Sequence, residues 1–506
     1  MAWLSGWDKR IKFTIDQTKI DTADLTWFPV TVFLDATNTP EVFTELTTDA
    51  EYLKVAFTQA DGTTELYAEM ELFDVSESKG IFHVSKDGWV IDYDVDTDFY
   101  MYFDKDHADN ANIGIPVRGS ELVVNGTDWT GATGHTPPNS WTCTANTGTY
   151  TIASGTLKFD YTHGYAFTYQ TITVVIGQTY RLSVDLKNFN CGAGVWAAAG
   201  TAQGGTQYGQ VIEKGTAGFT THVFTFTATQ TDCYLTFVGD VSGANQYGWV
   251  DNFSVKLVTS VSNNVWDNSF KMVQHMADKT TSTIIDSTIN ANDGTKGSAN
   301  NPLETAGMVG NGQTFSTDTI ITMGTFNDNG FSISLCVKPS NITTGQYVTE
   351  GTNDKRSILL GSQEGYFNIF NNGYPTGTAA ELQIAATINE WQNIVYGSDG
   401  TNILGYKDGE PIVTHAGNLN CSDVFSYYIG SHSTGVTYFA GIIDEVRISN
   451  VLRTAGWIKA TYNSLFDTLL TYGDEETAPA GWPHKWNGVT IGKLNGAVLT
   501  KWNGVA

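Results

Sequence analysis

The sequence has few basic residues and no long apolar run. Its 27 lysines and arginines are outnumbered by 53 aspartates and glutamates, which gives a net charge of −26. Nucleic acid and anionic membrane surfaces repel a protein this acidic, so we expect neither as a partner. No stretch of the sequence approaches the ~18 apolar residues of a membrane-spanning helix, and membrane insertion is therefore not expected.

Cysteine is scarce and follows no motif. The five cysteines are scattered, odd in number and free of any Cys-x-x-Cys pair. Cysteine-based zinc and redox motifs are therefore excluded, and at least one thiol stays free or pairs between chains, which favours folding in a reducing compartment. The first residues lack the apolar run of a signal peptide, so we expect synthesis in a cytoplasm without one.

Glycine and aromatic residues are abundant. The 506 residues include 52 glycines and 12% aromatic side chains, but only 16% charged ones. This composition is typical of all-β domains with many turns, and the length is too great for one hydrophobic core. We expect an all-β protein with three β-sandwich or jelly-roll domains in series and a short C-terminal tail of strand repeats.

Two strand-like segments each place one aspartate among apolar residues. They are Trp249-Val-Asp-Asn-Phe-Ser-Val-Lys-Leu257 and Ile442-Ile-Asp-Glu-Val-Arg-Ile448. Side chains alternate between faces along a strand, so Asp251 and Asp444 are predicted to share the apolar face. A carboxylate on a core face must be hydrogen-bonded, paired or bound to a metal. The repetition predicts two sandwiches, each with such a carboxylate near its last strand.

The N-terminal region contains several motifs in a fixed order. They are Gly6-Trp-Asp-Lys-Arg-Ile-Lys-Phe-Thr-Ile-Asp16, Phe28-Pro-Val30, Val55-Ala-Phe-Thr-x-x-Asp-Gly62 and Ala68-Glu-Met-Glu-Leu-Phe-Asp74. Residues 1–116 therefore resemble the DUF2341 family, which occurs in phage tail and microbial surface proteins. In that family a segment like Val265-Trp-Asp-Asn-Ser-Phe270 follows quickly, so the resemblance implies that residues 117–259 are an inserted domain.

The insert, residues 117–259, opens with an Asn-Gly turn at Gly126 and closes with the strand of Asp251. It resembles the jelly-roll carbohydrate-binding modules. This implies a structural calcium at Asp251 with Asn125 and Asp128 as further candidate ligands, while an Asp251 that accepts backbone N–H groups remains an equal alternative. Candidate glycan-binding residues have aromatic or amide side chains in loop-like segments: Tyr165, Trp196, Tyr208, Gln210 and Tyr247. For each of them alone, core or turn packing is the commoner role.

Residues 260–472 carry a third set of motifs, namely Phe331-Ser-Ile-Ser-Leu335, Lys407-Asp-Gly409 and Phe439-Ala-Gly-Ile-Ile-Asp-Glu-Val-Arg-Ile448. They resemble the laminin G-like, concanavalin-type sandwich. Asp286 and Asp293 lie in an Asx-rich loop and are candidate calcium ligands, although Asx-turns are the favoured alternative. For Asp444 we favour a structural buried carboxylate that accepts N–H groups from an adjacent loop.

Two short helices are predicted outside the strands. One spans residues 39–46, with Thr39 as its N-cap and Pro40 in the first turn. The other begins near Thr454 and places Ile458, Tyr462 and Leu465 on one stripe.

The C-terminal residues 473–506 form a linker and a repeat tail. Lys485-Trp-Asn-Gly488, Lys493-Leu-Asn-Gly496 and Lys501-Trp-Asn-Gly504 recur at a constant spacing. Asn-Gly favours hairpin turns, and such short hairpins need a partner to bury their side chains. The assembly candidates are Trp486, Asn487, Gly488 and Trp502, which would support a homo-oligomer or attachment to a partner. A loosely ordered tail is the alternative.

No catalytic motif is evident. Concanavalin-type glycanases carry a Glu-x-Asp-x-x-Glu strand, and the nearest arrangement here, Glu65, Glu69 and Glu71, lies in the first region and resembles an ordinary strand of its family. The nine histidines are dispersed, with no pair at metal-ligand spacing in the sequence. We therefore expect no enzyme activity and no cofactor other than structural calcium.

These observations favour a non-enzymatic virion protein of a tailed phage, either a fibre or a capsid decoration. We expect it at the virion surface, bound to other virion proteins, with surface glycans as its ligands. A bacterial or archaeal cell-surface adhesin is the alternative, and a polysaccharide-degrading enzyme is the third possibility.

Overall fold

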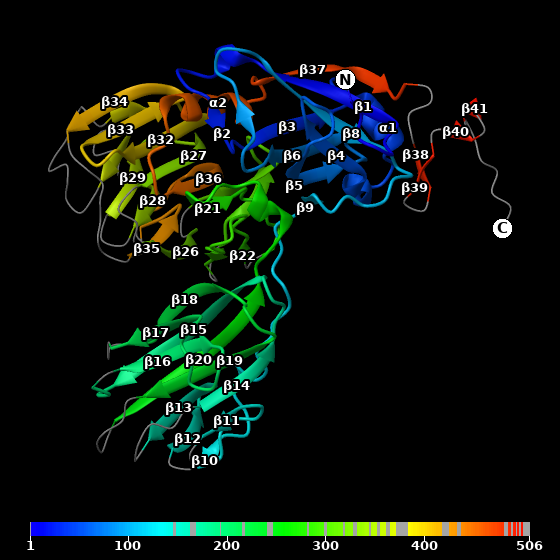
Figure 1. Cartoon of the computed structure of the whole chain (residues 1–506). Helices are drawn as coiled ribbons and strands as arrows, with labels where there is room; N and C mark the ends of the chain where they lie inside the picture. Colours follow the sequence, from blue (N-terminus) through cyan, green and yellow to red (C-terminus); the bar gives the residue numbers. More distant parts are fainter. Residues whose placement is uncertain are drawn as a thin grey trace. The chain divides into compact units, whose positions relative to one another are not determined.

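The computed structural model confirms the all-β class (Figure 1). It describes residues 2–144, 148–161, 168–192, 194–214, 218–239, 246–280, 283–297, 301–316, 319–326, 331–343, 346–351, 355–360, 365–370, 383–416, 425–432 and 437–479, and short strand segments between 484 and 498. The chain divides into two compact units: residues 1–116 with 260–506, and residues 117–259. In the part of the chain that the structure describes, no helix has the length and apolar character needed to cross a membrane.

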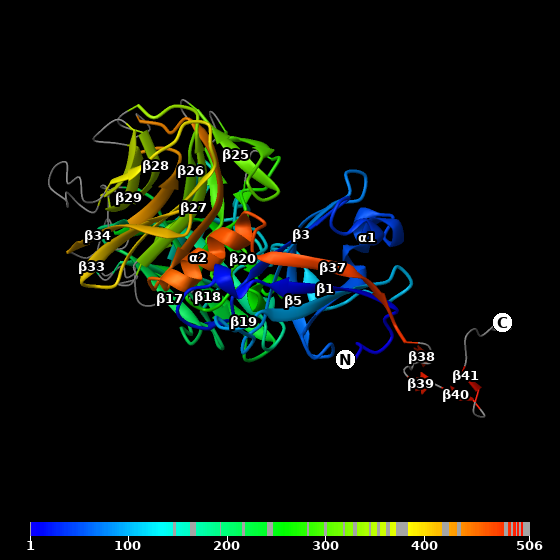
Figure 2. The same ribbon diagram turned by 90° about the horizontal axis from the view of Figure 1, so that it is seen from above.

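The first sheet of the larger unit is built mainly by residues 1–116. Its strands run in the order β3 (Val30–Asp35), β6 (Lys79–Ser85), β5 (Glu65–Asp74), β4 (Val55–Gln59), β8 (Thr97–Phe103), β1 (Lys9–Ile15) and β37 (Leu470–Thr477), and β9 (Ile113–Gly114) pairs with β5. Figure 2 shows β37 alongside β1, and the two strands pair antiparallel. The core of this sheet contains Trp266, Phe270 and Trp457 as well as N-terminal residues. Segments on both sides of the insert therefore build one core.

Two further sheets of this unit enclose a second core. One has the order β24 (Leu303–Ala306), β25 (Asn311–Phe315), β36 (Gly441–Ser449), β27 (Phe331–Pro339), β32 (Gln392–Ser398), β33 (Asn402–Lys407) and β34 (Glu410–Ala416), and β21 (Phe270–Gln274) pairs with β36. The other has the order β22 (Thr283–Ile284), β23 (Gly294–Lys296), β26 (Ile321–Phe326), β35 (Phe425–Ile429), β28 (Gln346–Gly351), β29 (Lys355–Leu360), β30 (Tyr366–Phe370) and β31 (Gln383–Ala385). Ile333, Leu335, Ile358 and Tyr427 are among the buried residues between the two sheets.

Both predicted helices are present. α2 (Ala455–Leu465) begins after Thr454, whose hydroxyl accepts the backbone N–H of Trp457 at 3.2 Å, as an N-cap residue does. α1 (Pro40–Glu45) also follows a threonine, but the predicted cap by the Thr39 side chain is wrong. The Thr39 hydroxyl instead accepts the backbone N–H of Asp35 at 3.1 Å, within the turn that precedes the helix.

The insert has two sheets around its own core. The first has the order β10 (Thr133–Gly134), β12 (Gly148–Ala153), β13 (Thr156–Tyr161), β20 (Tyr247–Leu257), β15 (Thr179–Phe189) and β18 (Thr220–Thr227). The second has the order β11 (Thr142–Cys143), β14 (Thr168–Thr173), β19 (Asp232–Gly239), β16 (Val195–Gly200) and β17 (Gly209–Glu213). Trp129, Trp141, Leu182 and Phe237 are buried between them.

The two aspartate segments are β20 and β36, and each contains a β-bulge directly after its aspartate. Asn252 and Glu445 have positive φ angles of 48° and 51°, and their backbone N–H groups donate to Asp251 and Asp444 at 2.9 and 2.8 Å. In each strand two residues after the aspartate oppose one residue on the neighbouring strand, so one residue is extra. A bulge of this kind interrupts the alternation of faces.

The prediction that these aspartates share the apolar face is therefore wrong. In β20 the core residues Phe253 and Val255 follow the bulge, whereas Trp249 and Asp251 precede it and are half-buried outside the core. In β36 the core residues Val446 and Ile448 likewise follow the bulge. Asp444 is nevertheless fully buried, because other elements of the same unit cover this face of the sheet.

The C-terminal segment contains more strand than a linker would. Residues 473–477, assigned to the linker and tail from the sequence, complete β37 and pair with β1. Further on, β38 (His484–Trp486) pairs with β39 (Val489–Ile491), and β40 (Lys493–Leu494) pairs with β41 (Ala497–Val498). Each pair flanks one of the Asn-Gly sequences. Trp486 lies in β38, and Asn487, Gly488 and Trp502 lie outside the described residues.

Candidate functional site

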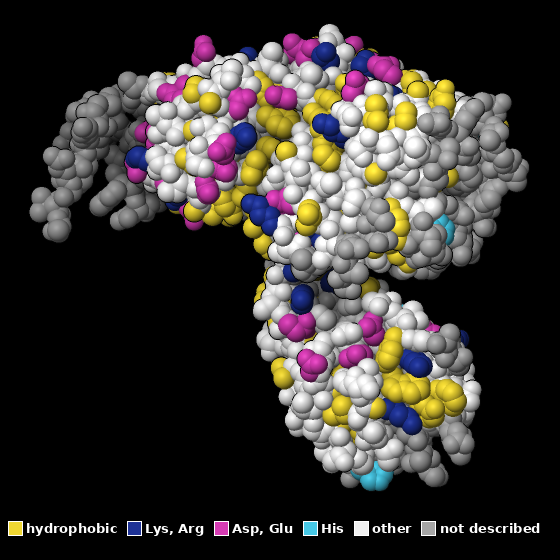
Figure 3. Space-filling view, turned by 180° about the vertical axis from the view of Figure 1, so that it is seen from behind, with side chains coloured by type: hydrophobic (Ala, Val, Ile, Leu, Met, Phe, Trp, Pro, Cys, Tyr) yellow, Lys and Arg dark blue, Asp and Glu magenta, His cyan; other side chains and the backbone are white. Residues whose placement is uncertain are grey.

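A strip of half-buried aromatic side chains lies on the first sheet of the insert. We call it the aromatic strip and define it as Phe189 of β15 with Tyr247 and Trp249 of β20. The Phe189 and Tyr247 rings stack with centroids 4.5 Å apart, and the Trp249 ring meets Tyr247 edge-on at 4.7 Å. The bulge of β20 comes after Trp249 in the chain. Tyr247 and Trp249 are therefore half-buried outside the core. Figure 3 shows hydrophobic and basic side chains together on one face of the insert.

Lysines and hydrogen-bonding groups border the aromatic strip. The Lys158 amine lies 3.7 Å from the Tyr247 ring centroid, and the Lys187 amine lies 4.7 Å from that of Trp249, which are cation–π distances. Further along the same strands, the Asn252 amide donates to Asp185 at 2.7 Å. The strip thus combines flat apolar rings with amide, carboxylate and ammonium groups at its edge.

The predicted glycan-binding residues are distributed over both sheets of the insert. Tyr247 belongs to the aromatic strip. Trp196 and Gln210 lie on the neighbouring strands β16 and β17 of the other sheet. Tyr208 packs against Phe226 and exchanges a hydrogen bond with Thr229, so it is largely part of the core edge. Tyr165 lies outside the described residues. The structure therefore does not gather these candidates into one site.

The predicted calcium ligands of the insert are held by hydrogen bonds. Asp251 accepts the Trp129 indole N–H at 3.3 Å and the Asn252 N–H at 2.9 Å, and burial raises its pKa. The Asn125 amide is engaged with Thr130, whose N–H it accepts at 2.9 Å. Asp128 is exposed. This arrangement resembles the hydrogen-bonded alternative, and calcium at Asp251 stays a prediction.

The carboxylates predicted in the concanavalin-type region are also engaged with N–H groups. Asp286 is fully buried and accepts the backbone N–H groups of Val273, Thr288 and Asn292 at 2.7–2.9 Å. Asp293 accepts the N–H of Asp286 at 2.9 Å. These contacts have the geometry of an Asx-rich turn.

Asp444 has the hydrogen bonds expected of a buried structural carboxylate. One of its oxygens accepts the N–H groups of Met308 and Val309 at 2.8 and 2.9 Å, and the other accepts the N–H of Glu445. Burial, followed by the charge of Glu445, raises the pKa of Asp444 well above its usual value.

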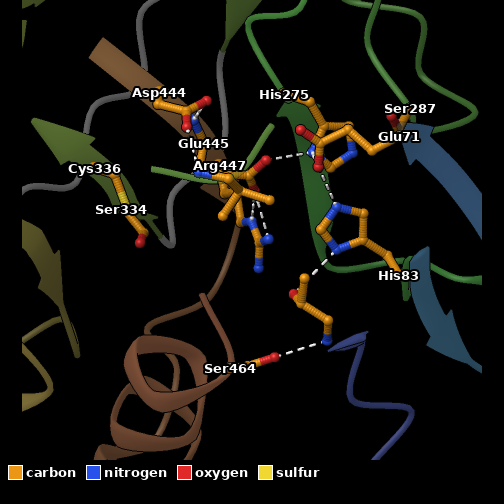
Figure 4. Close-up of polar contacts among 12 residues, drawn as sticks. Glu71, His83, His275, Ser287, Ser334, Cys336, Asp444, Glu445, Arg447 and Ser464 are labelled. Carbon is orange, nitrogen blue, oxygen red and sulfur yellow. Dashed lines mark hydrogen bonds and ion pairs between the residues drawn. The ribbon is translucent and has the colours of Figure 1, made fainter. Parts of the chain in front are cut away.

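Five buried titratable side chains form a cluster that the sequence did not reveal. We call it the Glu–His cluster and define it as Glu69, Glu71, His83, His275 and Glu445. Figure 4 shows four of them, Glu71, His83, His275 and Glu445, pointing toward one another. Their potential ligand atoms all lie within 4.8 Å of one another. The two histidines, far apart in the sequence, stack with ring centroids 4.4 Å apart.

Two sheets supply the side chains of the Glu–His cluster. Glu69 and Glu71 lie on β5 and His83 on the adjacent β6, while His275 directly follows β21 and Glu445 lies on β36. Bulges set the direction of two of the glutamates. Glu71 is an extra residue in the pairing of β5 with β6, and Glu445 is the bulge residue of β36. Each bulge re-aims a carboxylate that regular alternation would place elsewhere.

The contacts within the Glu–His cluster are short. His83 Nε2 lies 2.8 Å from Glu71 Oε2, and His275 Nδ1 lies 2.5 Å from Glu445 Oε1 and 3.5 Å from Glu71 Oε2. His275 Nε2 lies 3.2 Å from Glu69 Oε1. All of these side chains are at most 7% exposed.

Burial and neighbouring charges together set the protonation of four members of the Glu–His cluster. Burial raises the pKa of Glu71 well above its usual value and lowers the pKa of His83 well below its own. Burial also opposes charge on His275, but Glu445, Glu69 and Glu71 outweigh it and raise the His275 pKa well above 6.5. For Glu445, burial is outweighed by His275 and Arg447, which lower its pKa. A charged His275 beside an ionised Glu445, a neutral His83 and a protonated Glu71 is the consistent state of these four groups.

A cavity adjoins the Glu–His cluster. It has a volume of ≈ 350 Å³ and is lined by Glu69, Glu71 and His275, together with Met70 and with residues 115–116, 276–278 and 283–285. Of these three side chains, that of His275 is the most accessible, at 7% exposure against 0% for Glu69 and 2% for Glu71.

Sequence reasoning missed this cluster because its members are far apart in the chain. The one local signal was the pair Glu69 and Glu71 on a strand with buried neighbours, which is unusual for two carboxylates. The histidine partners cannot be recognised from spacing, because they join the glutamates only through the tertiary fold.

Comparison with known proteins gives limited similarity. No curated protein matches the sequence. Domain 4 of the extracellular arabinanase AbnA from Geobacillus stearothermophilus, solved in complex with arabinotriose, is 19% identical over 40% of this chain and 98% of its own, with a TM-score of 0.32. Trypanosoma rangeli sialidase in complex with sialic acid is 10% identical over 62% of this chain and 61% of its own, with a TM-score of 0.29.

The receptor-binding domain of botulinum neurotoxin mosaic serotype C/D is 12% identical, and the match covers 38% of this chain and 50% of that domain at a TM-score of 0.29. All of these TM-scores are below 0.5, so none of these structures bears on the function of this chain. Residues 310–459, within the predicted range 260–472, match the family model described as the Concanavalin A-like lectin/glucanases superfamily. The chain therefore contains a laminin G-like, concanavalin A-type domain at residues 310–459.

Proposed function

We propose that this protein is a non-enzymatic, glycan-binding structural protein of a tailed-phage virion, acting as a fibre or a capsid decoration. The observation that carries the glycan-binding part is the aromatic strip of the insert. The concanavalin-type domain supports it, because the superfamily description includes lectins. The resemblance of residues 117–259 to carbohydrate-binding modules supports it as well.

The aromatic strip has the chemistry that sugar recognition needs. The C–H faces of a pyranose pack on flat rings, and its hydroxyl groups require nearby donors and acceptors. Tyr247 and Trp249 supply the rings, while Asp185 and Asn252 supply a carboxylate and an amide. The lysines next to the rings add positive charge to an otherwise acidic chain, which suits a sugar that carries carboxylates.

Glycan binding by the full chain tests this proposal directly. We expect bacterial surface polysaccharides on an array to retain the protein and Trp249→Ala to abolish most of that binding. Trp196→Ala is the matched control, because it removes a half-buried tryptophan from the other sheet of the same insert. If Trp196→Ala loses binding and Trp249→Ala keeps it, the site lies on the other sheet and the role of the aromatic strip is refuted.

The virion part of the proposal rests on the resemblance of residues 1–116 and on the C-terminal hairpin repeats. Mass spectrometry of purified particles from the source organism tests it. Peptides of this chain at a high, fixed copy number per particle would support a fibre or decoration. Their absence from particles and presence on cell envelopes would instead support the adhesin.

A polysaccharide hydrolase is a second candidate for one reason. Glu69 and Glu71 both line the cavity, and burial raises the pKa of Glu71, as in glycosidases that pair a protonated with an ionised carboxyl group. The side chains of these residues are only 0% and 2% exposed, however, which leaves little surface for a sugar. Release of reducing ends from a bound polysaccharide, lost in Glu71→Gln, would favour the hydrolase over the binding protein.

A further inference from the structure

The Glu–His cluster has more acceptor groups than its own hydrogen bonds use. Glu71 Oε1 has no hydrogen-bond partner among the described residues, although the side chain is 2% exposed. A buried carboxylate oxygen without a donor is costly. The oxygen belongs to a residue that lines the adjoining cavity. Oε1 lies beside Gly310, 2.4 Å from the position of a Cβ there, while Oε2 faces His83 and His275. Glu71 is therefore short of positive partners.

Glu445 and His83 are held in place by residues outside the cluster. Glu445 Oε2 accepts Arg447 Nε at 3.0 Å and Nη2 at 2.5 Å, which leaves Oε1 directed at His275. His83 Nδ1 lies 3.2 Å from the Thr31 hydroxyl, so its Nε2 faces Glu71.

His275 lies between Glu69 on one side and Glu71 and Glu445 on the other. Its Nε2 faces Glu69 Oε1 at 3.2 Å, which leaves Nδ1 toward Glu71 and Glu445. Glu69 in turn accepts the Trp266 indole N–H at 2.6 Å and the Ser287 hydroxyl at 2.5 Å. Outer contacts of this kind orient the ligands of a metal ion. The far nitrogen of His83 has the Thr31 hydroxyl, whereas the far nitrogen of His275 has the Glu69 carboxylate at 3.2 Å without a hydrogen bond.

The inner atoms have nearly the spacing of a coordination shell. Ligands bonded to a metal at ~2.0–2.2 Å in a tetrahedron lie ~3.4 Å from one another. The three inner contacts of the cluster are 2.5, 2.8 and 3.5 Å, and all four groups lie within 4.8 Å. An ion at the centre would thus require sub-ångström movements of the closest pairs.

Charge balance also favours a dication. Glu69, Glu71 and Glu445 carry three negative charges when ionised, and Arg447 offsets one of them. A dication offsets the other two while both imidazoles remain neutral, which is the form that binds metals. The neighbouring Asp444 is already held by three backbone N–H groups.

We propose that Glu71, His83, His275 and Glu445 bind one divalent first-row transition-metal ion. Two imidazoles and two carboxylates suit an ion of the zinc class, whereas calcium prefers six to eight oxygen ligands. Glu71 and His83 come from the N-terminal sheet, and His275 and Glu445 come from the concanavalin-type part of the unit. The bound ion would therefore cross-link the two parts of the unit, and its cavity gives it a path of entry.

Zinc titration of the tag-free full-length protein, after removal of metals with chelator, tests the site. We expect one Zn²⁺ per chain by calorimetry and elemental analysis, no comparable binding of Ca²⁺, and a melting temperature that rises with zinc concentration.

Glu71→Gln is the decisive variant, because the amide resembles the protonated acid that the metal-free cluster holds. It should leave the melting temperature of the metal-free protein nearly unchanged and weaken zinc binding by more than the ~10–100-fold that loss of an outer-shell partner causes. His222→Gln is the control, since His222 forms a separate histidine–carboxylate pair with Glu213 at 3.2 Å. Equal zinc affinity in wild type and Glu71→Gln, or no zinc binding at all, would overturn the proposal.

Discussion

The ion pair of Arg447 and Glu445 gives the clearest test of the energetics of the Glu–His cluster. Arg447 donates through Nε and Nη2 to one oxygen of Glu445, and the two side chains are 4% and 0% exposed. Its guanidinium also lies 4.9 Å from the Trp266 ring. Arg447→Met keeps the length of the side chain and removes the charge, so Glu445 would stay buried beside His275 alone.

Breaking a buried pair by removing one partner costs about 3–5 kcal/mol, because the remaining charge is left uncompensated. We therefore expect Arg447→Met to lower the free energy of unfolding of the larger unit by about that amount, which is a large share of the ~5–15 kcal/mol typical of a domain. The comparison is Lys459→Met, whose partner Asp21 lies 2.9 Å away at 43% exposure. An exposed pair of this kind contributes about 0–1 kcal/mol.

The assay is urea unfolding of both variants and of wild type at one pH with metal removed, followed by tryptophan fluorescence. The double variant Arg447→Met with Glu445→Gln should recover part of the loss, since it removes the unpaired carboxylate as well. If Arg447→Met costs no more than Lys459→Met, the buried charge pair does not stabilise the fold, and the argument from charge balance loses its basis.

Four further outcomes are expected. Thr454→Ala should destabilise the larger unit by about 1 kcal/mol in the same urea assay, because the hydroxyl caps α2. Gly456→Ala should also destabilise the larger unit, because the alanine Cβ would lie 2.1 Å from the Asp21 carbonyl oxygen. Alanine is the better helix former by about 1 kcal/mol, so a gain in stability would contradict this packing. Folding raises the pKa of His275. The stability that this provides is complete below the unfolded pKa near 6.5 and is lost as the pH rises through the folded pKa. The melting temperature of the metal-free protein should therefore fall at alkaline pH, and His275→Gln should reduce that fall. Deletion of residues 479–506 should abolish self-association or particle attachment, as light scattering and particle pull-down would show, and normal assembly of the truncated chain would refute the role of the tail.

The sequence predicts the fold class and much of the local structure, because these depend on short-range patterns. Turn-rich composition indicates an all-β protein, and the position of Thr454 indicates the start of α2. The laminin G-like motifs indicate the region that matches the concanavalin-type family at 310–459. Each of these signals is contained in a few consecutive residues.

Side-chain direction was not predictable to the same degree. A strict period of two places Asp251 with Phe253 and Asp444 with Val446, but one residue with positive φ in each strand reverses the parity. Asparagine adopts such a conformation readily, while glutamate does so rarely, so nothing local marks Glu445. The Glu–His cluster adds a second difficulty, since its residues are brought together by sheet pairing and packing over the whole length of the larger unit.

The repeated aspartate motif links both candidate sites to one local device. In each case the aspartate accepts the N–H of the bulge residue and so stabilises the bulge. In β20 the strand keeps Phe253 and Val255 in the core, yet Trp249 remains outside it, which is what the aromatic strip requires. In β36 the strand keeps Val446 in the core, yet it turns Glu445 toward His275. A regular strand could satisfy only one of these demands, so the bulge is what allows a core strand to carry a functional side chain.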